Sequence, residues 1–215
     1  MILSKYWDVF FITGVGYTLL LALITVVFGA LLGLIFCLGR MSRVKVLNWI
    51  VVAIVEVVRG TPMLLQLYVG YLLVPKVLPF TVTEFQSIAV ALIINSAAYV
   101  SEVFRSGIQA VDKGQSEAAR SLGLSASQTM LKIVIPQAVK NIIPALGNEF
   151  ITITKDTSLA STFFVGELMT SYLKVRGATY LTMECLFIVG AIYFVLTFIL
   201  SKCMNAFERR LKAND

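Results

Sequence analysis

The sequence predicts an all-α integral membrane protein with five transmembrane helices, an outside N-terminus and an inside C-terminus. Composition is the first observation, because the 215 residues are 58% hydrophobic and only 14% charged, with a mean hydropathy of +0.87. The second is a series of apolar runs long enough to cross a bilayer, and the third is the gathering of Lys and Arg in alternate connections. Helices are expected because an open sheet cannot satisfy its backbone polar groups in lipid. Residues 1–215 are predicted to form one transmembrane domain.

The first predicted span covers about residues 10–38. No charged residue occurs between Val9 and Gly39, and roughly 20 apolar residues suffice to cross the hydrocarbon core. Gly29 and Gly33 within this span form a GxxxG spacing, which lets two helices approach closely. The spacing therefore indicates that another helix could pack closely against this face.

The second predicted span covers about residues 48–74 and is interrupted by Arg59-Gly60-Thr61-Pro62. Proline removes a backbone donor, so we expect a kink there. Glu56 lies three residues before Arg59 on one helical face, and the two side chains could pair. The pair is then either structural, or it stands beside backbone carbonyls that line a solute path.

The third, fourth and fifth spans are predicted at about residues 86–106, 143–165 and 181–201. The third carries a polar stripe at spacings of four, three and four, and the fourth carries a second stripe with two acidic residues beside it. The first stripe is Asn95, Tyr99, Glu102 and Ser106, and the second is Asn148, Thr152 and Lys155, with Glu149 and Asp156 nearby.

An ionisable group near the bilayer centre costs about 2.5–3.5 kcal/mol on insertion scales, so it faces a partner or a cavity. These stripes therefore either hold helices together through hydrogen bonds or line a solute path at a subunit interface. A zwitterionic solute needs a site of mixed sign. The predicted substrate path comprises Glu56, Arg59, Asn95, Tyr99, Glu102, Lys155 and Asp156.

The distribution of positive charge predicts the orientation. With the N-terminus outside, inside connections hold twelve of the 18 Lys and Arg residues and outside segments hold four. The short connection with Arg40, Arg43 and Lys45 has the same bias. Positive charge is retained on the cytoplasmic side, so the net charge of +6 reflects topology rather than nucleic-acid binding.

Residue types exclude several chemistries. Histidine is absent, which removes the commonest catalytic base and metal ligand. Cys37, Cys185 and Cys203 are scattered, so they form neither a CxxC pair nor a disulfide framework. We therefore predict no catalytic residues and no metal site.

A polar segment over about residues 107–142 interrupts the apolar chain. Gly123 permits a turn that other residues resist, and Ser125 with Gln128 has capping-box spacing. We therefore expect two short helices around the glycine, the second of which Pro136 breaks or redirects. The segment is either a solvated linker or a docking site for a partner.

The spacing of Glu117-Ala118-Ala119, Gly123, Ile133 and Pro136 resembles the EAA loop of ABC importer permeases, in which a short helix docks on a cytoplasmic ATPase. Glu56, the Arg59–Pro62 run and Gln66 resemble the pattern of permeases for polar amino acids. Two further matches to that subfamily are Gly114-Gln115 and Lys155-Asp156-Thr157-Ser158-Leu159. Where the family has leucine before the loop proline, this chain has Ile135.

The resemblance implies a type I ABC importer permease fold with a cytoplasmic coupling helix, in the bacterial plasma (inner) membrane. It assigns coupling to the ATPase to Glu117, Ala118, Ala119, Leu122 and Gly123. The implied function is transport of histidine, glutamine, arginine or cystine by alternating access, without catalysis by this chain. The chain has no GxxxxGK[ST] phosphate loop, so ATP and Mg would be bound by the partner.

The implied partners are an ABC ATPase dimer, a second permease subunit in a homo- or heterodimer, an extracytoplasmic amino-acid-binding protein and membrane lipid. An ion-coupled secondary amino-acid transporter is the alternative, because it too uses broken helices and buried charges. The lack of an internal repeat disfavours that alternative. Uptake without any ATPase subunit would distinguish the two.

Overall fold

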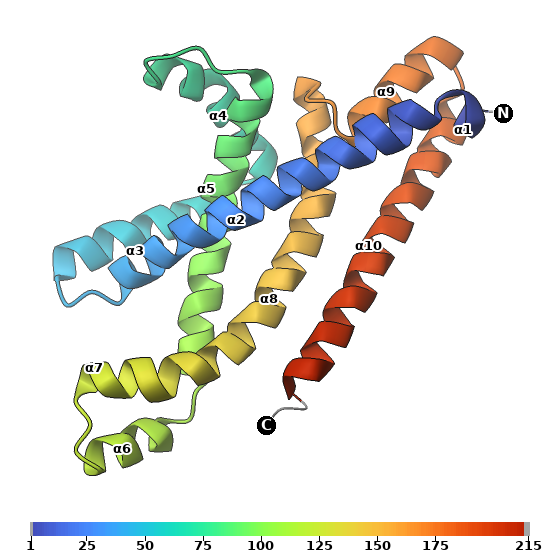
Figure 1. The fold of residues 1–215 in the computed structure, drawn as a ribbon. Coiled ribbons are helices and arrows are strands. Elements are labelled where there is room, and N and C mark those ends of the chain that lie inside the picture. The colour runs from blue at the N-terminus through green and yellow to red at the C-terminus, as the bar shows by residue number, and fades with distance from the viewer. Residues whose placement is uncertain (1, 213–215) are drawn as a thin grey trace.

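The computed structural model describes residues 2–212, within which every regular element is helical (Figure 1). The single domain predicted over 1–215 thus includes residues 1 and 213–215, which lie outside the described part. The elements in chain order are α1 (Ile2–Lys5), the π-helix η1 (Asp8–Val15), α2 (Gly16–Arg40), α3 (Lys45–Arg59), α4 (Met63–Val77), α5 (Glu84–Gln109), α6 (Lys113–Ser121), α7 (Ala126–Thr129), the π-helix η2 (Met130–Val134), α8 (Ile135–Asp156), the 3-10 helix η3 (Thr157–Phe163), α9 (Leu168–Thr179) and α10 (Thr182–Lys212).

Within residues 2–212, three helices are long and apolar enough to cross a membrane: Asp8–Arg40, Glu84–Gln109 and Thr182–Leu211. They coincide with the first, third and fifth predicted spans. The count rises to four if the bent pair α3–α4 is one span. The fourth predicted span falls on α8 and η3, and the total of five remains a prediction, as does the orientation.

The second predicted span, over 48–74, is not one continuous helix. The axes of α3 and α4 differ by 111° across a short break. α3 ends at Arg59, and Pro62 precedes the first residue of α4 in an extended conformation with ψ of 136°. The predicted kink is confirmed, but its size separates the span into two helices.

The helix that was expected to be broken or redirected at Pro136 is not broken there. α7, η2 and α8 form one continuous helical run from Ala126 to Asp156, and Pro136 stands in the first turn of α8. A missing N–H is tolerated where a helix begins, and the preceding π turn shifts the pattern so that Ile135 N donates to Met130 O. The predicted polar segment over 107–142 is therefore mostly helical.

Helices α2 and α5 pack closely through the GxxxG glycines. A Cβ added at Gly29 would lie 2.8 Å from Ser96 Oγ, and one at Gly33 would lie 2.9 Å from the carbonyl oxygen of Ala97. Because only glycine leaves this space, the two backbones can approach each other. The close helix contact predicted for this face is confirmed.

A buried acidic side chain begins α9, a helix that the sequence did not predict. Glu167 is fully buried, and its carboxylate accepts hydrogen bonds from Met169 N at 2.6 Å and Thr170 N at 2.7 Å. Tyr193 OH on α10 donates to the same carboxylate at 3.2 Å. Burial raises the pKa of the Glu167 carboxyl, and the hydrogen bonds from Thr170, Met169 and Tyr193 act against that shift. The carboxylate thereby joins the N-terminus of α9 to α10.

The first and last helices reach opposite ends of the helical array. In Figure 1 α1 lies beside α9, whereas α10 ends toward the side that carries α6 and α7. The polar segment with α6 and α7 therefore projects away from the end that holds α9.

Candidate functional site

A cavity of about 300 Å³ lies where α5, α8 and the α3–α4 break meet. It brings together three residues of the predicted substrate path, Asn95, Tyr99 and Asp156. The full lining is Thr61, Met63, Asn95, Tyr99, Glu149, Thr152, Ile153, Asp156 and Leu159.

The cavity is acidic on the α8 side. Glu149 and Asp156 are seven residues apart, so they lie on one face of the helix about two turns from each other. Ser96 Oγ donates to Glu149 Oε1 at 3.0 Å, which joins α8 to α5. None of the described residues that line the cavity is Lys or Arg. The lining therefore offers carboxylate oxygens to a solute with N–H donors.

The α5 side of the cavity is neutral and polar. Asn95 is 5% exposed, and its Nδ2 donates to Gln66 Oε1 at 2.8 Å. The ring of Tyr99 is covered by the Arg59 guanidinium, whose central carbon lies 5.6 Å from the ring centroid. Cation–π attraction thus holds a positive charge against the ring of a lining residue.

The predicted ion pair between Glu56 and Arg59 is confirmed, with Arg59 Nη1 3.9 Å from Glu56 Oε1. Neither residue lines the cavity. Arg59 reaches it only through Tyr99, so the pair borders the predicted path rather than forming it.

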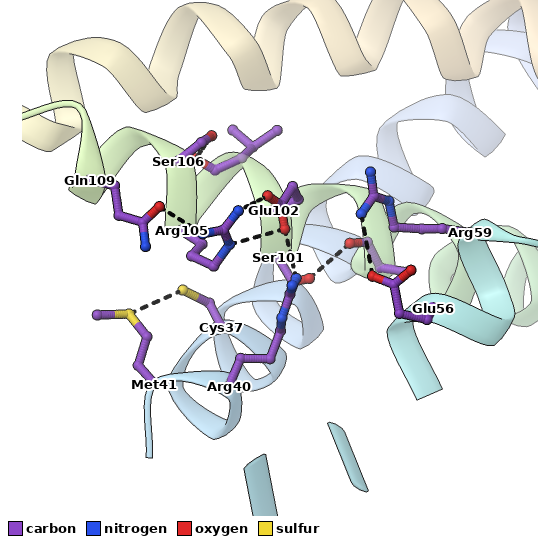
Figure 2. A network of polar contacts seen from close by, with 12 residues as sticks. Cys37, Arg40, Met41, Glu56, Arg59, Ser101, Glu102, Arg105, Ser106 and Gln109 are labelled. Carbon is purple, nitrogen blue, oxygen red and sulfur yellow. Dashed lines mark hydrogen bonds and ion pairs between the residues drawn. The ribbon is translucent and has the colours of Figure 1, made fainter. Parts of the chain in front are cut away.

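Glu102 is held away from the cavity by two arginines. Figure 2 shows its carboxylate pointing toward Arg40 and Arg105; Arg40 Nη1 lies 2.8 Å from Glu102 Oε2, and Arg105 donates to both carboxylate oxygens. Arg40 is the last residue of α2 and Arg105 follows Glu102 by one turn on α5. A carboxylate near two guanidinium groups is satisfied by them, which explains why the structure does not bring it into the predicted path.

Lys155 is also separated from the cavity. It lines a different hollow of about 340 Å³ with Ser158, Met169 and Tyr193 among its neighbours. Adjacent helical residues point about 100° apart, so Lys155 and Asp156 face different surfaces. The second stripe was predicted as Asn148, Thr152 and Lys155, whereas the face turned to the cavity is Glu149, Thr152 and Asp156.

The polar segment has the predicted turn. Gly123 has φ of +85°, and an added Cβ would meet nothing within 4 Å. Only glycine adopts this conformation without strain. Ser125 Oγ accepts from Gln128 N at 3.3 Å and Gln128 Oε1 accepts from Ser125 N at 2.9 Å, which confirms the predicted capping box.

The helix before this turn presents only part of the predicted coupling surface. Glu117 and Ala118 are exposed, and Leu122 is 83% exposed. Ala119 is 5% exposed, so its side chain is turned away from the surface that Glu117 and Ala118 present. Three successive helical residues span about 200°, so Glu117 and Ala118 can face outward while Ala119 faces inward.

Two polar residues at the break were not assigned to the predicted substrate path, although both belong to the motif noted in the sequence. Thr61 lines the cavity, and Gln66 hydrogen-bonds to Asn95. Both are polar residues in an apolar span, one on each side of Pro62. Their position beside Pro62 could have identified them, because polar side chains near a proline break can bond to the carbonyls that it frees.

Comparison with known proteins relates the whole chain to one group. Residues 25–213 match the family described as binding-protein-dependent transport system inner membrane component. The arginine transport system permease protein of Bacillus subtilis (strain 168) is 41% identical over 206 residues, which cover 96% of this chain and 94% of the relative. The L-cystine transport system permease protein of the same organism is 36% identical over 212 residues, which cover 98% and 90%.

The fold has a counterpart among solved structures. A crystal structure of an amino acid ABC transporter with histidines contains a chain that superimposes with a TM-score of 0.91 at 41% sequence identity. The match covers 97% of this chain and 96% of that chain. Similarity in sequence and in fold therefore extends along nearly the entire molecule.

Proposed function

This chain belongs to the family of binding-protein-dependent transport system inner membrane components, and from that premise we propose that it is the permease subunit of an ATP-driven importer for polar amino acids. Relatives named for arginine and L-cystine transport align along almost its whole length. The chain is a multi-pass protein of the bacterial inner membrane.

The observation that carries the solute assignment is the pair of carboxylates in the cavity. Glu149 and Asp156 face the same space as the polar groups of Asn95 and Tyr99. An amino acid presents an ammonium group to such a lining, and a cationic side chain adds a second donor for the other carboxylate. A solute of positive net charge therefore fits this cavity better than an anionic one.

The polar segment transmits the motion that drives transport. Leu122 extends from the end of α6 with 83% of its surface exposed, and Gly123 turns the chain immediately after it. An exposed leucine beside a fixed turn suits a groove on an ATPase, which would bind ATP and Mg. Closure of the ATPase dimer would move α6 and switch the cavity between the two sides of the membrane.

The assembly contains further subunits. A second permease, identical or homologous, completes the translocation path, and an extracytoplasmic binding protein delivers the solute. In the five-span topology the bent pair α3–α4 is the second span and α8 with η3 is the fourth. The N-terminus is outside and the α6 segment lies in the cytoplasm beside the ATPase.

Uptake in proteoliposomes tests this function. The chain is reconstituted with its cognate ATPase and binding protein, and labelled arginine, glutamine and glutamate are offered outside with ATP enclosed. We expect uptake that needs enclosed ATP and survives ionophores, with arginine preferred. An ion-coupled secondary transporter would instead take up solute without the ATPase and would stop when ionophores collapse the gradients.

A further inference from the structure

The side chain of Gln66 supplies a hydrogen-bond donor that the backbone lacks at the α3–α4 break. In a continuous helix the carbonyl of Val58 would accept from the N–H of the residue four positions on, which is Pro62. Proline has no N–H. Gln66 Nε2 donates to Val58 O at 2.6 Å, so the side-chain amide takes the place of the missing backbone donor.

The same amide nitrogen fixes the turn between the two helices. An amide nitrogen carries two hydrogens, and the one not used on Val58 is shared between the carbonyl oxygen of Thr61 at 3.1 Å and Thr61 Oγ1 at 2.8 Å. Thr61 Oγ1 in turn donates to the carbonyl of Val57 at 2.9 Å. Because Thr61 also lines the cavity, the position of one lining residue depends on Gln66.

The oxygen of the Gln66 amide reaches the opposite side of the cavity. Gln66 Oε1 accepts from Asn95 Nδ2 at 2.8 Å, and Asn95 is 5% exposed. A planar amide whose nitrogen is held in one direction presents its oxygen in another. With Nδ2 bound to Gln66, Asn95 keeps Oδ1 as an acceptor, and it lines the cavity with the carboxylates of Glu149 and Asp156.

We propose that Gln66 is a positioning residue of the solute site, which orients the Asn95 amide toward solute and couples it to the backbone of the α3–α4 break. This inference rests on the proposed function. Gln66 itself is absent from the cavity lining, so it acts through Asn95 and Thr61. A change of the angle between α3 and α4 would be transmitted through this amide to the solute contact.

A double-mutant cycle on uptake kinetics tests the proposal. Gln66→Ala, Asn95→Ala and the double variant are compared in the reconstituted complex, with arginine as solute. We expect each single variant to raise KM about five- to tenfold, the loss of one or two hydrogen bonds, with kcat within about twofold. The double variant should have no higher KM than Asn95→Ala alone, because the two residues act as one unit.

The control is Gln86→Ala, which removes another glutamine hydrogen bond. Gln86 Oε1 accepts from Thr83 N at 2.9 Å at the start of α5, and Gln86 does not line the cavity. Its KM should equal that of the wild type. Thermal stability in detergent is recorded for every variant, so that destabilisation of the turn between α3 and α4 is measured separately from loss of solute affinity.

Additive effects on KM, or an effect of Gln66→Ala on stability with an unchanged KM, would overturn the proposal. If Gln66→Ala does not assemble, Gln66→Met has similar length without the amide and enters the same cycle. Failure of both variants while Asn95→Ala assembles would assign Gln66 to folding alone. If the wild-type complex itself shows no ATP-driven uptake, the proposed function fails rather than this inference.

Discussion

Ser96 Oγ lies 3.0 Å from Glu149 Oε1, and this hydrogen bond joins α5 to α8 beside the cavity. Ser96 is fully buried and also lies against Gly29 of α2. Ser96 therefore contacts α2 and α8 from its place on α5. A carboxylate bonded to such a fixed hydroxyl keeps its direction, as a binding site requires.

Glu149→Gln should reduce transport of cationic solutes more than neutral ones. The substitution keeps the shape of the side chain and removes its charge, and hydrogen bonds to charged groups are the stronger ones. We expect kcat/KM for arginine to fall about tenfold or more, from a loss of roughly 1.5–3 kcal/mol, and kcat/KM for glutamine to fall less. Equal losses for both solutes would contradict an electrostatic role. Glu184→Gln, an exposed glutamate in the first turn of α10, is the control.

Leu122→Asp should weaken association with the ATPase and leave the fold intact. The side chain is 83% exposed, so its replacement costs the isolated permease little, whereas a charge in an apolar groove is costly. We expect less ATPase to co-purify and uptake to fall with it, at an unchanged melting temperature of the permease. Ser127→Asp, exposed on the neighbouring α7, serves as control. Full co-purification of Leu122→Asp would argue against docking through α6.

Gly123→Trp should uncouple ATP hydrolysis from transport. The φ of +85° strains any residue with a Cβ, and a large ring would stand at the turn beside α6. We expect uptake to fall several-fold while ATPase activity persists, measured on the same reconstituted sample. Uptake at the wild-type rate would contradict the docking role of this turn.

Gly147→Ala should destabilise the contact between α8 and α10, since an added Cβ would overlap the Met204 sulfur. Met204 is a flexible side chain whose end can move aside, so the cost should lie at the low end of the range of about 1–3 kcal/mol for overpacking, and the melting temperature in detergent should fall slightly. Met204→Ala in the same chain should restore much of that loss by making room. Gly190→Ala on α10 is the matched control, because nothing lies within 4 Å of its added Cβ. A melting temperature unaffected by Gly147→Ala would refute this account of the packing.

Glu102→Ala should affect stability and not solute affinity. Its loss leaves Arg40, whose side chain is 11% exposed, without its carboxylate partner, and breaking a partly buried pair costs on the order of 1–3 kcal/mol. Glu56→Ala removes a more exposed pair, with 62% of the Glu56 side chain accessible, and should cost under about 1 kcal/mol. The two variants are compared by melting temperature and by KM. A raised KM for Glu102→Ala would contradict this account and indicate that Glu102 belongs to the solute path.

The sequence predicted features that depend on neighbouring residues. The capping box at Ser125 and Gln128, the turn at Gly123 and the pair of Glu56 with Arg59 all arise within a few positions. Helical periodicity likewise placed Asn95 and Tyr99 on one face of α5. Local geometry is nearly determined by residue type at such sites.

Features that depend on distant partners could not be predicted. Glu102 shares the α5 stripe with Asn95, yet Arg40 of α2 draws its carboxylate away. The face of α8 was misjudged by one residue, because the packing of the helix decides whether Lys155 or Asp156 faces the cavity. The size of the bend, 111°, likewise does not follow from the presence of Pro62, and the bond from Gln66 to Asn95 links segments 29 positions apart.

Solute protection of a cysteine in the cavity tests the central claim most directly. Thr152 is exposed and lines the cavity, whereas Cys37 and Cys185 are buried and Cys203 is exposed. Thr152→Cys is therefore made together with Cys203→Ser, and its rate of modification by a small thiol reagent is measured in the reconstituted complex. The account predicts that arginine slows modification with the same concentration dependence as its transport. A rate that saturating arginine leaves unchanged, in a complex that still transports it, would contradict passage of solute through this cavity.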